Sequence, residues 1–179
     1  MKAKEKILQE AVRLFSKKGY AETSADEIIM KSGTSKGLLF YHYTNKDGLL
    51  SAVLERAWEI IQQSCVVERN DKNAGRELRE LIKNMTHSLK VDFDYWKVYA
   101  AVSLNPELSK KLDINISNPS EAYQNLTSDL FDKMGRNNPA RWAFFFDIQF
   151  RGIYFGYISA PKKFPLENAK QVMIDMFTR

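Results

Sequence analysis

Hydrogen-bonding and basic side chains gather in one short stretch near the start of the chain, SGTSKGLLFYHYTNKDGLL, residues 32–50. Thr34 and Ser35 can donate hydrogen bonds to base edges or phosphates, and Lys36 can reach a guanine edge or a phosphate. Gly37 has no side chain, so it allows the backbone to approach DNA closely. Each residue also has an alternative role without DNA: Ser35 can cap a helix, Lys36 can be a solvated side chain, and Gly37 can belong to a fraying helix end.

The aromatic residues that follow cannot all face inward on one helix, so at least one ring is exposed. We expect Tyr41 to place its hydroxyl at a phosphate, and Tyr43 to pack against the first helix. Phe40 has no hydroxyl and can only pack or touch a thymine methyl group or a sugar, whereas Leu39 belongs to the core. A protonated His42 can bind a phosphate, but an exposed or capping role fits it equally well.

Residues on both sides of this stretch extend the predicted contact with the DNA backbone. Lys46 lies at the start of the next helix, where both the free amide groups and the ammonium favour a phosphate. Thr23 and Ser24 begin the preceding helix and can do the same on the other side of the groove.

Helix signals explain how these residues are positioned. An apolar stripe over residues 7–15 predicts a first helix that Gly19 ends. Ser24 caps a second helix, and Glu27, three residues later, completes a capping box. Gly33 ends this helix and Ser35 caps a short third one, so residues 24–41 describe a helix-turn-helix. A fourth, longer helix starts at a cap on Asn45.

The rest of the chain also has helical spacing, without alternating strand patterns or an internal repeat. Prolines preceded by capping residues mark three further starts, and a fourth proline opens the last helix; they are Asn105-Pro106, Asn118-Pro119, Asn138-Pro139 and Pro165. We therefore predict an all-α chain of about nine helices.

Composition limits the classes of function. Residues 1–46 hold nine Lys and Arg against five Asp and Glu, whereas the remaining 133 residues are nearly balanced. This basic excess suits a polyanion partner, although a solubilising surface explains it equally well. The single cysteine, Cys65, indicates a reducing, cytoplasmic compartment, and neither a signal peptide nor a membrane span is expected.

An enzyme is not expected. The sequence has two histidines, His42 and His87, and neither has a carboxylate at a metal-ligand spacing. Cys65 has no glycine-rich loop to activate it. We therefore expect no catalytic residue, metal or cofactor.

The predicted helix NPARWAFFFDIQFRGIYFGYIS, residues 138–159, is apolar on two opposite faces, which indicates burial on both sides. The first face carries two glycines four residues apart; it consists of Phe145, Ile148, Gly152, Phe155, Gly156 and Ser159. The second face would look into the protomer's own core; it consists of Trp142, Phe146, Gln149, Phe150, Ile153 and Tyr157.

The stretch TSADEIIMKSGTSKGLLFYHYTNKDGLL resembles the signature of the TetR family of one-component bacterial regulators, over roughly residues 5–55. The resemblance implies contacts with DNA at Thr23, Ser24, Thr34, Ser35, Lys36, Gly37, Tyr41, His42 and Lys46. Four positions depart from the usual pattern: Ile29 replaces alanine, Thr34 valine, Phe40 tyrosine, and Gly48 an acidic residue. The loss of the hydroxyl at Phe40 removes one expected phosphate contact.

The resemblance also implies the roles of the larger part of the chain. Residues 1–46 would form the three-helix DNA-binding domain, and residues 47–179 a helical domain for effector binding and dimerisation. The first face of the helix at 138–159 would be the homodimer interface, together with the last helix. An apolar or aromatic effector would bind among Trp58, Ile61, Met85, Trp96, Tyr99, Phe146 and Gln149.

The function that follows is a transcriptional regulator, a repressor that binds a palindromic operator in double-stranded DNA as a dimer and is released by a small molecule. The alternative is a helical DNA-binding or protein-interaction module without effector control.

Overall fold

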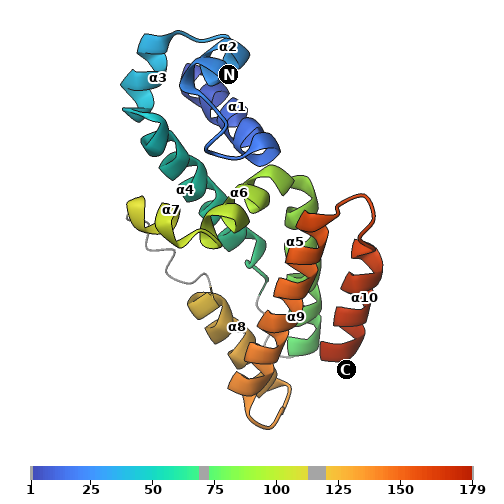
Figure 1. Cartoon of the computed structure of the whole chain (residues 1–179). Helices are drawn as coiled ribbons and strands as arrows, with labels where there is room; N and C mark the ends of the chain where they lie inside the picture. Colours follow the sequence, from blue (N-terminus) through green and yellow to red (C-terminus); the bar gives the residue numbers. More distant parts are fainter. Residues whose placement is uncertain (1, 69–72, 113–119, 179) are drawn as a thin grey trace. The chain divides into compact units, whose positions relative to one another are not determined.

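The structure, a computed structural model, describes residues 2–68, 73–112 and 120–178, with the side chains of 120–122 left out (Figure 1). These residues form ten α-helices and no strand. The helices are α1 (Ala3–Lys18), α2 (Ala25–Ser32), α3 (Lys36–Tyr43), α4 (Lys46–Ser64), α5 (Ala74–Val91), α6 (Phe93–Ser103), α7 (Pro106–Lys111), α8 (Ser120–Lys133), α9 (Pro139–Ser159) and α10 (Leu166–Phe177).

The predicted all-α class is confirmed, with one helix more than expected among the described residues. Helices α5 and α6 are separated by a single residue, Asp92, whose amide still donates to the Ser88 carbonyl oxygen at 2.8 Å. No glycine or proline lies between residues 76 and 105, so the sequence carries no strong signal for this break. The predicted cap at Asn118-Pro119 lies outside the described residues.

The chain divides into two compact units. The first unit consists of Met1–Glu59 and Asp94–Ser117, so α6 and α7 pack with the N-terminal helices. Its core joins the apolar faces of α1, α3 and α4 to Val98 and Val102 of α6. The predicted boundary at residue 46 separates the residues expected to contact DNA from the rest of the chain, and this boundary stays a prediction.

The second unit consists of Ile60–Phe93 and Asn118–Arg179. Helix α9 packs against α8 and α10, and α5 packs against α8 and α10 (Figure 1). Three fully buried rings lie at the centre of this unit: the Phe146 centroid is 5.0 Å from that of Phe177 and 6.1 Å from that of Phe131. The second face of α9 therefore points into its own unit, as predicted.

Candidate nucleic-acid interface

The turn between α2 and α3 is built as the sequence predicts. The Ser24 hydroxyl accepts a hydrogen bond from the Glu27 amide at 3.1 Å, and the Ser35 hydroxyl accepts one from the Leu38 amide at 3.2 Å. Gly33 ends α2 in the left-handed region, at φ 63°. Two caps and one glycine therefore set the direction in which α3 leaves α2.

Buried side chains of α3 fix its rotation against the rest of the unit. Leu39 is fully buried, and the Tyr43 hydroxyl donates to the Lys4 carbonyl oxygen of α1 at 2.8 Å. Both roles were predicted. At Gly48 a Cβ atom would collide with the Tyr43 carbonyl oxygen, which explains why this chain has glycine where the resemblance leads one to expect an acidic residue.

The opposite face of α3 is open to solvent and mixes polar, basic and aromatic groups. Tyr41 is 83% exposed, and the Lys36 side chain is 71% exposed with its Nζ 3.8 Å from Asp26. Gly37 is exposed, and a Cβ atom added there would meet only the Ser35 hydroxyl, at 4.0 Å. The ion pair between Lys36 and Asp26 is long and exposed, and therefore weak, so Lys36 can exchange Asp26 for a phosphate or a base.

Thr23 and Lys46 are positioned differently from the predicted phosphate contacts. Thr23 is 1% exposed, and its hydroxyl donates to the Gly19 carbonyl oxygen at 2.8 Å. The Lys46 Nζ donates to the carbonyl oxygen of Thr23 at 2.7 Å and lies 4.2 Å from the centroid of the Tyr20 ring. Burial lowers the pKa of the Lys46 ammonium. Both side chains therefore fix the turn between α1 and α2, because the Thr23 hydroxyl and two of the three Lys46 donors are bonded to its carbonyl oxygens.

Thr34 and His42 are half-buried at the edges of the exposed face. The Thr34 hydroxyl is 2.8 Å from the Ser32 hydroxyl, so it shares a hydrogen bond within the turn. His42 packs edge-on between the rings of its neighbours, 5.1 Å from Tyr41 and 6.2 Å from Tyr43. The structure thus brings together Ser24, Ser35, Lys36, Gly37 and Tyr41 as exposed groups at the ends and on the face of the helix-turn-helix.

A polar cluster behind this face has no signature in the sequence. The Tyr20 hydroxyl donates to the Asp47 carboxylate, and the Lys111 Nζ lies 3.0 Å from the same carboxylate. Hydrogen bonds from Tyr20 and Lys111 lower the pKa of Asp47, while burial and the contact with Asp47 raise the pKa of Tyr20. The three residues are 27 and 64 positions apart, so no local pattern could have joined them.

The predicted effector residues are divided between the two units. Trp58, Trp96 and Tyr99 belong to the first unit, and Ile61, Met85, Phe146 and Gln149 belong to the second. Among them Phe146 is fully buried, and its ring packs against rings of its own unit. The effector site as a set stays a prediction.

Sequence reasoning missed Tyr123 of α8, whose hydroxyl is buried and has no hydrogen-bond partner among the described residues. Burial raises the pKa of this hydroxyl, and the next largest influences come from Cys65 and Asp147. Asp147 itself pairs with Arg151 at 2.8 Å. An unpartnered buried hydroxyl is costly, so it marks a candidate contact for a ligand.

The first face of α9 is partly open, with one exception. Phe145 and Ile148 are 40% and 45% exposed, and Gly152 has no atom within 4 Å of a Cβ position. At Gly156, however, a Cβ atom would collide with the Phe164 ring of the same unit. The close approach expected there between two protomers is thus made within one protomer, because the turn after α9 folds back over this glycine. Phe155 is half-buried and Ser159 exposed.

No three His, Cys, Asp or Glu side chains among the described residues are arranged to hold a metal ion. None of the helices that the structure describes has the length and apolarity needed to cross a membrane.

Comparison with known proteins relates the N-terminal part of the chain to a family of regulators. Residues 7–53 match the sequence model of the bacterial regulatory proteins of the tetR family. The HTH-type transcriptional regulator QacR of Staphylococcus aureus is 32% identical over 120 residues, which cover 62% of this chain and 63% of QacR. The biofilm operon icaADBC negative transcriptional regulator IcaR of Staphylococcus epidermidis is 30% identical over 104 residues, which cover 58% of this chain and 55% of IcaR.

Similarity of fold extends further than similarity of sequence. The match spans less than two thirds of the length of either curated relative. A solved structure of a SmeT–triclosan complex superposes with a TM-score of 0.70 at 18% identity, and the superposition covers 99% of this chain and 90% of that one. Residues 7–53 thus match the tetR family of bacterial regulatory proteins in sequence, and the chain as a whole shares the fold of the SmeT structure.

Proposed function

We propose that this protein is a transcriptional repressor in the cytoplasm that binds a palindromic operator in double-stranded DNA as a homodimer. The observation that carries this proposal is the exposed, mixed face of α3, where Ser35, Lys36 and Gly37 form the first turn and Tyr41 the last. The first residues of a recognition helix are the ones that contact base edges. IcaR, a relative, is a negative regulator, which supports repression.

The second unit supports the dimer. One recognition helix reads only a few base pairs, whereas two related by a two-fold axis read half-sites about 34–36 Å apart. Exposed apolar side chains of α9 and α10 supply a surface for this contact; they are Phe144, Phe145, Ile148, Val172 and Met176. Gly152 leaves space for close approach of the partner helix.

Selection of binding sites from genomic fragments is the direct test. The expected product is a palindromic site bound with strong salt dependence, since contacts with phosphates release counterions. A protein that recovers no specific sequence, or one that binds a single half-site equally well, would contradict the proposal.

We also propose that a small apolar or aromatic molecule releases the repressor. A regulator of this fold has been solved with triclosan bound, and the unpartnered Tyr123 hydroxyl offers a polar contact in the second unit. Of the predicted residues, Ile61, Met85, Phe146 and Gln149 belong to the same unit as Tyr123 and form the proposed site with it, while Trp58, Trp96 and Tyr99 stay predictions from the sequence. The ligand must favour one spacing of the two recognition helices, which typically couples the sites by about 1–3 kcal/mol.

A ligand screen by thermal shift, followed by operator titration with each hit, tests release. Tyr123→Phe should leave the free protein as stable or more stable, because it removes an unsatisfied group, and should weaken hits that hydrogen-bond there. Trp58→Ala and Tyr99→Ala should weaken all hits. Hits that stabilise the protein without changing operator affinity would leave the alternative: a DNA-binding module without effector control.

A further inference from the structure

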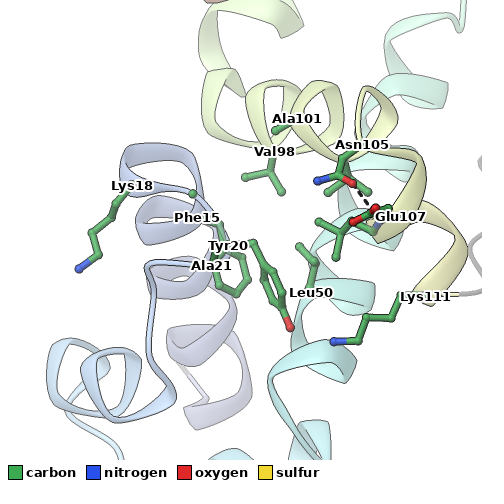
Figure 2. A pocket seen from close by; sticks show the side chains of 13 residues that line it. Phe15, Lys18, Tyr20, Ala21, Leu50, Val98, Ala101, Asn105, Glu107 and Lys111 are labelled. Carbon is green, nitrogen blue, oxygen red and sulfur yellow. Dashed lines mark hydrogen bonds between the residues drawn. The ribbon is translucent and has the colours of Figure 1, made fainter.

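A cavity lies within the first unit, behind the proposed DNA-reading face. It has a volume of about 410 Å³, within the range of small-molecule sites. The end of α1 and the turn after it form one wall, Leu50 of α4 the base, and α6 and α7 the other wall (Figure 2). Phe15, Leu50, Val98 and Val102, all buried core residues, line the base and both walls of this cleft.

Three charged side chains line the cleft: Lys18 and Lys111 are paired with carboxylates, and Glu107 is exposed. Lys111 is paired with Asp47 at 3.0 Å. Lys18 is paired with Glu27 at 2.6 Å, and Figure 2 shows its ammonium directed away from the cleft. A ligand whose charge lies among Phe15, Leu50 and Val98 would have to break one of the two lysine pairs or stay unpaired in an apolar space, and both are unfavourable.

Two groups can recognise an uncharged ligand. The Tyr20 ring lines the cleft, and its hydroxyl donates a hydrogen bond to Asp47. This bond fixes the orientation of the ring, which can therefore pack against an aromatic ligand. Asn105 stands at the rim; its Oδ1 accepts from the Leu108 amide at 3.0 Å, which leaves the Nδ2 to donate to a ligand oxygen. An aromatic body with one hydroxyl group matches this lining, because rings pack well edge-on or offset against a tyrosine.

We propose that this cleft is a binding site for a small, uncharged aromatic molecule that carries a hydrogen-bond acceptor. The site differs from the effector site proposed above, because its lining includes neither Tyr123 nor any of the predicted effector residues. It lies against the turn at Gly19–Ala21 that Lys46 and Thr23 fix, so a bound molecule contacts the segment that orients α2. Binding requires no DNA, and its failure would leave the proposed function untouched.

The test uses the full chain without DNA and three probes of similar shape: 1-naphthalenemethanol, 1-naphthoate and 1-naphthylmethylammonium. Calorimetry should show saturable binding of the alcohol and at least tenfold weaker binding of both ions. Methyl NMR shifts should change at Leu50, Val98 and Leu108.

Two matched variants of α6 locate the site. Ala101→Trp adds a ring at an exposed cleft position and should weaken binding of the alcohol at least tenfold. Ser103→Trp adds the same ring at an exposed position of the same helix outside the cleft, and should leave binding of the alcohol unchanged. Both proteins should keep the helical circular dichroism of the original chain. Absence of saturable binding, tighter binding of either ion, or equal binding to Ala101→Trp and the original chain would each overturn the proposal.

Discussion

Two exposed surfaces of this protein carry aromatic side chains, and they differ in what surrounds the rings. On α3, Tyr41 and Phe40 stand beside Lys36 and the Ser35 hydroxyl. On α9, Phe144, Phe145 and Ile148 stand together, and α10, which packs against α9, adds Val172 and Met176. The first surface offers hydrogen bonds and positive charge, which suit a nucleic acid; the second offers apolar area, which suits another protein surface.

This contrast teaches that exposure of rings alone does not identify a partner. The neighbouring groups decide, because a phosphate must be met by donors whereas a protein surface must be met by shape and apolar area. Four predictions test whether the two surfaces have these separate roles, from the largest expected effect to the smallest.

The largest effect is expected from a charge on the α9 surface. Ile148→Asp should dissociate the dimer, because a carboxylate would be buried without a partner. Operator affinity should then fall by about 10²–10⁴-fold, since the two half-sites are no longer bound by one molecule. Light scattering and operator titration measure both effects. Asn137→Asp, which adds the same charge in the exposed loop before α9, is the control; an intact Ile148→Asp dimer would refute the interface.

Changes on the α3 surface should weaken DNA binding without affecting assembly. Lys36→Ala should lower operator affinity by about 1–3 kcal/mol if it contacts a guanine, and flatten the salt dependence by about one unit of slope if it contacts a phosphate. Tyr41→Phe should lower affinity by about 0.5–1.5 kcal/mol. Lys83→Ala, on α5 of the other unit, is the control. Unchanged affinity in both α3 variants would place the recognition surface elsewhere.

The variant Lys46→Ala distinguishes a contact of Lys46 with DNA from a purely structural contact. If Lys46 contacts a phosphate, as the sequence predicts, Lys46→Ala weakens binding to all DNA sequences and flattens the salt dependence. Since its ammonium is held by the Thr23 carbonyl oxygen, we now expect instead a loss of stability of about 1.5–3 kcal/mol and an unchanged salt slope. Thermal unfolding and salt titration distinguish the two, and a flatter slope at unchanged stability would restore the first interpretation.

The smallest single effect is expected at Gly152, which forms a matched pair with the second glycine of α9, Gly156. Gly152→Ala should stabilise the folded chain by about 0.5–1 kcal/mol, since alanine favours a helix and its Cβ meets nothing within the protomer. Gly156→Ala should destabilise it by about 1–3 kcal/mol, because the new methyl group would overlap the Phe164 ring. Denaturant unfolding of the matched pair measures the difference; equal stabilities would show that Phe164 moves aside without cost.

The sequence by itself determined the local features of this protein. Caps at Ser24, Ser35 and Asn138, and the left-handed Gly33, are signals that act within four residues, so they were predictable without any knowledge of the fold. The burial of Leu39 and Tyr43 followed from helical spacing. These features sufficed to place the helix-turn-helix and its exposed first turn.

Only the tertiary structure decided which polar groups remain available and which glycines remain open. Thr23 and Lys46 turn inward because both donate to carbonyl oxygens of the segment between α1 and α2, and Gly156 is covered by a ring eight residues further along. The Tyr20–Asp47–Lys111 cluster and the cleft beside it join segments up to 96 positions apart, from Phe15 to Lys111. Contacts of this kind depend on how whole helices pack, and a local pattern carries no information about that packing.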